Sequence, residues 1–195
     1  MDFLGLRTLT VIQDTIDLVK QNQGIDVKFD EKMNDPKVYK LWQNGESVGI
    51  FQFESQGMTN FMKELKPDCL EDIIAGVSLY RPGPMDQIPR YIANKKDPEH
   101  AVYTHPALKP ILEVTYGCMV YQEQVMQIVR DLAGYSLGRA DLVRRAMGKK
   151  KLDVMAKERE IFIHGQIDEN GNIVVPGCIR NGIDEQSANK IFDEM

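Results

Sequence analysis

Apolar residues recur three and four positions apart along much of the chain, which is the spacing of amphipathic helices. The first such stretch carries Ile12, Ile16 and Val19 behind a Thr10-x-x-Gln13 pattern typical of a helix start. Four later stretches repeat the spacing: Met58, Phe61, Met62 and Leu65; Ile73, Ile74 and Val77; Val125, Ile128, Val129 and Leu132; and Ala188, Ile191, Phe192 and Met195. A further helix is predicted over residues 152–163. The pattern predicts a mainly α fold.

Capping residues and breakers bound several of these helices. Helix starts are predicted at Asp35-Pro36, Asp68-x-x-Glu71 and Ser136. Helix ends are predicted at Asn44-Gly45, Gly134, Gly148 and the rigid Arg81-Pro82-Gly83-Pro84 turn. No Gly or Asn follows the helical pattern of residues 187–195, and we therefore expect the chain to be an excised piece of a longer protein.

Two segments have the character of short strands. Residues 48–53 form a strand candidate, and residues 166–175 hold Asn170-Gly171 between β-forming residues, which is a hairpin signal. The predicted fold is therefore a helical body with one or two small β-ribbons. There is no internal repeat and no low-complexity segment.

Composition excludes several classes of protein. Of the 195 residues 43% are hydrophobic and 27% charged, as in ordinary globular proteins. No apolar run approaches the roughly 20 residues that cross a bilayer, so we expect a cytoplasmic protein without membrane contact. Cys69, Cys118 and Cys178 are odd in number and far apart, which predicts three reduced thiols and no zinc site.

The net charge of −5 is unevenly distributed. Residues 139–159, here named the basic stretch, hold eight basic and three acidic side chains, so the stretch carries +5 and the remainder −10. A local basic stretch on an acidic protein can still bind polyanions, because the field and counterion release depend on local charge.

Familiar site patterns are missing from the chain. It has no Gly-x-Gly-x-x-Gly, no Gly-Lys-Ser/Thr and no His-Glu-x-x-His. Residues 168–172 resemble a calcium loop only loosely, because their glycine stands at the fourth position rather than the sixth. His100, His105 and His164 have no partner at ligand spacing. These patterns give no catalytic or metal site of a familiar kind.

The basic stretch is more informative. Its charges stand on a predicted helix and the turn after it: Arg139, Arg144, Arg145, Lys149, Lys150 and Lys151. Arginine forks to two phosphate oxygens and lysine acts as a point charge, so this cluster suits a triphosphate or a DNA backbone. A solvated surface helix with a lysine-rich turn explains the same residues. Tyr121 could stack on a base, although a packing role is the simpler interpretation.

Five segments in this order resemble one family: Asp2-Phe3-Leu4-Gly5-Leu6-Arg7-Thr8-Leu9-Thr10, Gly49-Ile50-Phe51-Gln52-Phe53-Glu54-Ser55, Arg81-Pro82-Gly83-Pro84, Tyr121-Gln122-Glu123-Gln124-Val125-Met126 and Arg144-Arg145-Ala146-Met147-Gly148-Lys149-Lys150-Lys151. The family is that of the bacterial C-family replicative polymerases, the DNA polymerase III alpha subunits. The resemblance covers nearly the whole chain. Each segment alone is weak evidence for the family, whereas the five segments together, in register, are specific evidence for it.

The resemblance implies a right-hand polymerase with palm, thumb and fingers. Residues 1–10 would end the palm, with Asp2 as the third catalytic carboxylate, and residues 11–195 would be the fingers domain, truncated at its C-terminus. The implied nucleotide-binding residues are Arg144, Arg145 and Arg81. The implied DNA-binding residues are Lys149, Lys150, Lys151 and Arg139. The implied partners are a dNTP, primer–template DNA and, through regions outside this chain, other replicase subunits such as the sliding clamp.

The same resemblance limits what this chain can catalyse. The family pairs its third carboxylate with an Asp-x-Asp, which occurs nowhere in these 195 residues. Phosphoryl transfer to a primer needs two cations about 3.5–4 Å apart, held by several carboxylates. Asp2 would therefore bind Mg²⁺ only together with palm carboxylates that this chain lacks. The parent is expected to be a nucleotidyltransferase, and the fragment to be inactive by itself.

Two other functions stay open on the residues alone. One is a non-enzymatic helical module that binds nucleic acid through the basic stretch. The other is a protein-interaction domain in which the charges only face solvent. The ordered set of five segments favours the polymerase.

Overall fold

The computed structural model describes residues 5–29, 31–149 and 151–195. These residues form helices and one two-stranded antiparallel ribbon, which confirms the mainly α prediction. The chain divides into two compact units, residues 1–76 and 77–195, and each is described by itself. None of the described helices is long and apolar enough to cross a bilayer.

Unit 1 holds three helices and the start of a fourth: α1 (Arg7–Gln23), α2 (Pro36–Asn44), α3 (Gln56–Leu65) and α4 (Leu70–Leu79). Helix α1 begins at Arg7, ahead of the predicted Thr10 cap, and its N-cap residue Leu6 makes no side-chain capping bond. No residue of α1 is buried. The helix is therefore stabilised by its own backbone rather than by packing within the unit.

The core of unit 1 lies around α2 and α3. As predicted, Asp35 caps α2, accepting a hydrogen bond from the Lys37 N–H at 2.9 Å. The predicted apolar face of α3 is buried in full: Met58, Phe61, Met62 and Leu65. Trp42 on α2 meets Phe53 edge-on, with ring centroids 5.6 Å apart. Apolar periodicity therefore identified the packed face correctly.

The strand predicted at residues 48–53 is wrong. The segment is a series of turns in which the Ile50 N–H bonds to Ser47 O and the Phe53 N–H bonds to Ile50 O. Gly49 and Gln52 have φ values of 77° and 68°, which an extended strand does not allow. The buried Ser47 hydroxyl closes the loop by donating to Phe53 O at 2.8 Å.

Unit 2 contains six α-helices and the ribbon: α5 (Ile88–Lys96), α6 (Lys109–Leu112), α7 (Gln122–Ala133), α8 (Leu137–Gly148), α9 (Leu152–His164), β1 (Gln166–Ile167), β2 (Ile173–Val175) and α10 (Glu185–Glu194). Short 3-10 turns stand at Pro84–Gln87, Pro98–His100, Pro106–Leu108 and Glu113–Thr115. The helices predicted in residues 122–163, the hairpin and the last helix are confirmed. Residues 85–120 were given no element by sequence.

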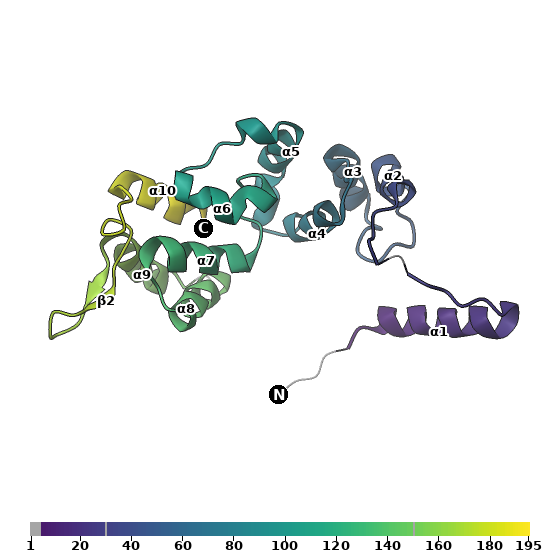
Figure 1. Ribbon diagram of the computed structural model, residues 1–195, viewed down its shortest axis with the longest axis horizontal. Helices are drawn as coiled ribbons and strands as arrows, with labels where there is room; N and C mark the ends of the chain where they lie inside the picture. Colours follow the sequence, from purple (N-terminus) through teal and green to yellow (C-terminus); the bar gives the residue numbers. More distant parts are fainter. Residues whose placement is uncertain (1–4, 30, 150) are drawn as a thin grey trace. The chain divides into compact units, whose positions relative to one another are not determined.

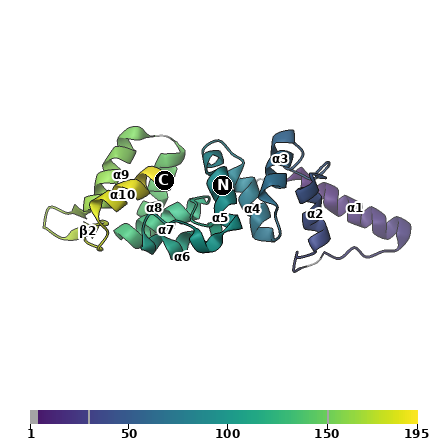
Figure 2. The same cartoon turned by 90° about the horizontal axis from the view of Figure 1, so that it is seen from above.

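The core of unit 2 is built from the inward faces of α6 to α10. Its largest fully buried members are Phe162, Leu108, Leu112, Ile128, Ile163, Ile191, Val129, Val143 and Val175. Helix α7 packs along α8, and α9 along α10 (Figures 1 and 2). The inward face of α8 consists of Ala140, Val143 and Ala146. These small residues let α8 approach α7 closely.

A tight connection fixes the direction of α8. Gly134 ends α7 at φ 77°, and its N–H bonds to Arg130 O at 2.9 Å. After Tyr135, the Ser136 hydroxyl accepts from the Arg139 N–H at 3.3 Å, as the sequence predicts for a cap. Caps at both ends of this short connection thus define where α7 ends and α8 begins.

We expect Gly177→Ala to destabilise the chain by more than about 4 kcal/mol, which is exceptional for a point substitution. Gly177 has φ 79°, and a Cβ there would lie 2.3 Å from the Gly165 backbone nitrogen. Gly182→Ala is the matched control, because Gly182 has φ 85° with open space around it, and should cost only about 1–2 kcal/mol. Urea unfolding measures both. Equal losses would contradict the close backbone contact.

Candidate functional site

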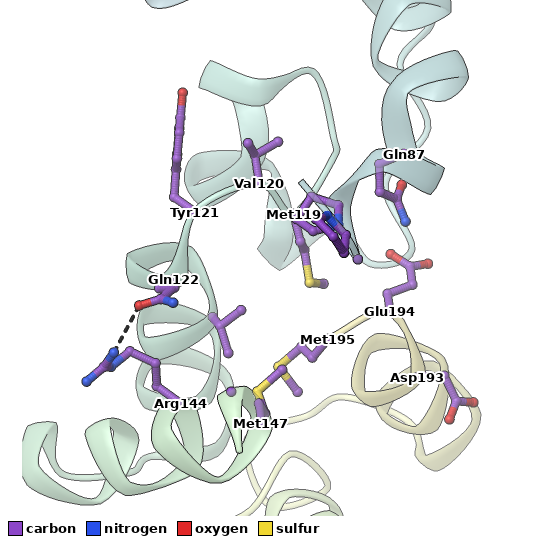
Figure 3. Close-up of a pocket in the computed structure, with 15 residues that line it drawn as sticks. Gln87, Met119, Val120, Tyr121, Gln122, Arg144, Met147, Asp193, Glu194 and Met195 are labelled. Atoms are coloured by element: carbon purple, nitrogen blue, oxygen red, sulfur yellow. Dashed lines mark hydrogen bonds between the residues drawn. The ribbon is translucent and has the colours of Figure 1, made fainter. Parts of the chain in front are cut away.

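A pocket of about 470 Å³ opens in unit 2 (Figure 3). Segments far apart in sequence line it: Pro82, Gly83, Pro84 and Gln87; Met119, Val120, Tyr121, Gln122 and Val125; Arg144, Met147 and Gly148; and Asp193, Glu194 and Met195. Three of the five segments that carry the family resemblance therefore meet at one pocket. Figure 3 shows Gln122 and Arg144 on one side of Met147 and Met195, and Gln87 and Glu194 on the other.

One side of the pocket is the turn of residues 81–84. The Arg81 N–H bonds to Leu79 O at 2.8 Å, and Arg81 O accepts from the Met85 N–H at 3.1 Å. Gly83 has φ 106°, a conformation that favours glycine. Proline and glycine of the turn line the pocket, whereas the exposed Arg81 does not.

A buried glutamine holds the second side. Gln124 Oε1 accepts from the backbone N–H groups of Val120 and Tyr121, both at 2.9 Å. Its amide nitrogen donates to Thr115 Oγ1 at 2.7 Å. A buried amide whose hydrogen bonds are made on both ends specifies one backbone arrangement. Gln124 thus fixes the segment that presents Tyr121 and Gln122 to the pocket.

Arg144 lies on the pocket side of α8. Its Nε and Nη2 donate to Asp141 Oδ1 at 2.9 and 2.7 Å, and its Nη1 donates to Gln122 Oε1 at 2.9 Å. The side chain is 30% exposed. Each terminal nitrogen of a guanidinium carries a second N–H, which can still donate to a phosphate oxygen.

Arg145 shares the same carboxylate. Its Nε lies 2.7 Å from Asp141 Oδ2, and its side chain is 63% exposed. Hydrogen bonding from Arg144, followed by the charge of Arg145, lowers the pKa of Asp141 below its ordinary value. The carboxylate therefore stays ionised at neutral pH. The two predicted nucleotide-binding arginines are thus held side by side.

The lysines follow at the end of α8. The Lys149 N–H bonds to Arg145 O at 3.1 Å as the helix C-cap, and the Lys151 N–H bonds to Ala146 O at 3.1 Å. Both residues are exposed. Helix α8 ends at Gly148, so these two lysines follow it, as the sequence predicted for the lysine-rich turn. Lys150 lies outside the described residues.

Arg139 is engaged by other parts of unit 2. Its guanidinium donates to Glu158 on α9, with Nη2 3.2 Å from Oε1, and to Gln166 at the start of β1. It also lies over the ring of Tyr135, 5.1 Å from the centroid. The Tyr135 hydroxyl donates to Glu158 Oε2 at 2.9 Å, and burial raises the pKa of this phenol. Arg139 therefore joins α8 to α9 and the ribbon.

Possible metal ligands gather at one place among the described residues. One group of possible ligands lies close together, Asp68, Cys69 and Asp72, with ligand atoms within 4.8 Å of one another. Burial raises the pKa of the Cys69 thiol to about 11, and Mg²⁺ prefers an all-oxygen octahedron. This group therefore does not fit Mg²⁺. Asp2, the predicted catalytic carboxylate, lies outside the described residues.

Comparison with known proteins identifies the family of this chain. Residues 8–170 match the family described as the bacterial DNA polymerase III alpha subunit finger domain. The chain belongs to this fingers family. The family resemblance predicted from the five segments is thereby confirmed.

Full-length relatives give the same result. Over the whole chain the sequence is 48% identical to DNA polymerase III subunit alpha of Thermus aquaticus, covering 16% of that protein. It is 50% identical to the Rickettsia felis subunit over 98% of the chain, and 44% identical to the Staphylococcus aureus subunit over 99%, covering 15% and 17% of those proteins. The chain thus spans about a sixth of the length of these polymerase subunits.

The sequence did not identify the two side chains that hold Arg144, which are Asp141 on α8 and Gln122 at the pocket. Asp141 stands three and four positions before the arginines, a spacing that signals ion pairs on one helix. Gln122 belongs to a segment that was recognised, but nothing in sequence placed it beside Arg144. The sequence also did not predict that Met119, Met147 and Met195 would meet at the pocket, because their convergence depends on tertiary packing.

We expect Glu158→Gln to destabilise the fingers fragment by about 1–3 kcal/mol, because a neutral amide with one acceptor oxygen replaces the ionised carboxylate that Arg139 and the buried Tyr135 hydroxyl share. Glu160→Gln is the matched control on the same helix. Glu160 is exposed and lies 3.7 Å from His164, so its loss should stay within about 0.5 kcal/mol. Thermal unfolding of both variants measures the difference. An unchanged Glu158→Gln variant would show that the network carries no stability.

Proposed function

We propose that this chain is the nucleotide- and DNA-positioning part of a bacterial replicative DNA polymerase. The parent enzyme joins a dNTP to a primer 3′-hydroxyl under the direction of a template. Relatives of which this chain matches about a sixth bear the name DNA polymerase III subunit alpha, and that name supports the reaction.

One observation carries the proposal. The pocket brings together three separate motifs of the fingers family, with a cationic arginine on one side and an apolar base of methionines. A dNTP offers both a polyanionic and an apolar part. Charge-assisted hydrogen bonds from arginine recognise the oxygens of a phosphate group in a geometry that lysine cannot copy. We infer that Arg144 and Arg145 bind the triphosphate.

The neighbouring cations are assigned to DNA. Lys149 and Lys151 are exposed beyond the end of α8, where flexible point charges suit a phosphate backbone. Lys150 stays a prediction with them. For Arg139 the prediction of DNA contact also stands, beside its structural bonds to Glu158 and Gln166. Arg81 stays a nucleotide-binding prediction, because only its neighbours Pro82 to Pro84 line the pocket.

The catalytic centre is assigned to the rest of the parent protein. We infer that residues 1–10 end the palm, that residues 11–195 are fingers, and that Asp2 joins palm carboxylates outside this chain to bind Mg²⁺. The metal would supply charge neutralisation and an activated primer hydroxyl. This chain's own contribution is to bind and orient the phosphates. The other implied partner is primer–template DNA, with clamp contacts made by other regions.

In the full-length parent polymerase, we expect Arg144→Ala or Arg145→Ala to reduce kcat/KM for dNTP by about 10- to 150-fold. Each change removes charge-assisted hydrogen bonds of about 1.5–3 kcal/mol. Steady-state primer extension measures the effect, and DNA affinity should change little. Arg180→Ala, an exposed arginine outside the pocket, is the control. Wild-type dNTP kinetics with weakened DNA binding would contradict the assignment.

We expect Lys149→Ala with Lys151→Ala to weaken DNA binding by the parent and to leave the KM for dNTP nearly unchanged. Each lost phosphate contact should reduce the log–log salt slope by about 0.7–0.9. Fluorescence anisotropy across a salt series gives the slope. The paired control is Lys109→Ala with Lys190→Ala, two exposed lysines of unit 2. An unchanged slope would favour the solvated-surface interpretation of these lysines.

A further inference from the structure

One carboxylate lies between the two arginines assigned to the triphosphate. Asp141 Oδ1 accepts two hydrogen bonds from Arg144, and Oδ2 contacts Nε of Arg145 at 2.7 Å. The three residues stand at positions i, i+3 and i+4 of α8, where side chains on adjacent turns meet. Both oxygens of a single carboxylate thus hold two guanidiniums that would otherwise repel one another.

We propose that Asp141 is a positioning residue, which holds Arg144 and Arg145 together in the orientation that receives a triphosphate. The proposal rests on the proposed function and adds to it the way in which the arginines are preorganised. Long cationic side chains on a surface helix otherwise sample many rotamers, and ordering them on binding costs affinity or rate. A carboxylate that orders them in advance removes that cost.

The position of Gln122 supports this role. It is the first residue of α7 and accepts from the Arg144 Nη1 at 2.9 Å, on the opposite side of the guanidinium from the Nε that Asp141 engages (Figure 3). Arg144 is therefore held by partners on two helices, which is more than an ion pair along one helix provides. The remaining N–H of each terminal nitrogen is left for a ligand.

A purely structural role for Asp141 predicts a different outcome. Its side chain is 28% exposed and that of Arg145 63%, and ion pairs so accessible to water contribute little to folding stability. If Asp141 only supported the helix, neutralising it would leave the kinetics of the polymerase unchanged. A positioning role instead predicts slower chemistry in a protein of unchanged stability.

The direction in which Asp141→Asn should change the KM for dNTP follows from the negative charge that it removes. Asp141→Asn keeps the shape of the side chain and removes a negative charge next to the proposed phosphate site. Attraction of dNTP is therefore not weakened, so KM should stay the same or fall. Because the guanidiniums lose their fixed orientation, kcat should fall about 10- to 100-fold. This division between KM and kcat differs from the loss expected when an arginine itself is removed.

The test uses the full-length parent polymerase in steady-state primer extension. Asp141→Asn is made in the wild-type enzyme and in an Arg144→Ala/Arg145→Ala enzyme, and thermal unfolding of each variant is recorded. Asp131→Asn is the matched control, because Asp131 also pairs with an arginine, Arg130, on α7 away from the pocket. If the Asp141 carboxylate acts through the arginines, Asp141→Asn should lower kcat at least tenfold in the wild-type enzyme and less than twofold in the Arg144→Ala/Arg145→Ala enzyme.

Two results in these experiments would overturn the proposal. One is an unchanged kcat for Asp141→Asn, whether or not KM rises, and the other is an equal fall of kcat in both backgrounds. Should Asp141→Asn unfold at a lower temperature, Asp141→Glu keeps the charge and should recover part of kcat; no recovery would also contradict it. If the double arginine variant alone keeps wild-type kinetics, the proposed function fails as well. That outcome is separate from the failure of Asp141 alone.

Discussion

The buried seam between α7 and α8 is the constraint on which the site depends. Helix α8 packs on α7 and buries Ala140, Val143 and Ala146 on its inward face. Since side chains on a helix are separated by about 100°, burying this face turns Asp141, Arg144 and Arg145 outward. The directions of the charged groups are therefore set by apolar packing. The caps at Gly134 and Ser136 keep the seam in register.

A second consequence of this seam is that the arginines are ordered before any ligand arrives. Asp141 and Gln122 hold Arg144 from two helices, while Gln124 keeps the Gln122 segment in place through Thr115. The site thus has a supporting layer made of neutral amides and one carboxylate. Hydrogen-bond donors that are already oriented need little reorganisation when negative charge develops on a bound phosphate. Such an arrangement therefore stabilises a transition state more than it strengthens ground-state binding.

Much of this was accessible from sequence, and the limits have physical causes. Helices with periodic apolar faces and clear caps, such as residues 122–133 and 137–148, were predicted because local chemistry decides them. The strand at residues 48–53 was predicted wrongly, since Gln52 adopts a positive φ that its residue type does not signal. Residues 85–120 gave no pattern, since the range is divided into short helices and 3-10 turns, two of which begin at prolines, Pro98 and Pro106. Arg139 shows the same limit for the candidate site. Its charge was evident from the sequence, but its partners Glu158 and Gln166 come from tertiary contacts.

The central claim is that the triphosphate is received by Arg144, which lines this pocket, and by Arg145, which shares the Asp141 carboxylate with it. A cryo-electron microscopy structure of the full-length parent with primer–template DNA and a non-hydrolysable dNTP tests it most directly. The account predicts phosphate oxygens about 2.7–2.9 Å from guanidinium nitrogens of both arginines, with Asp141 still between them. Phosphates bound elsewhere, with both guanidiniums facing solvent or DNA, would contradict it.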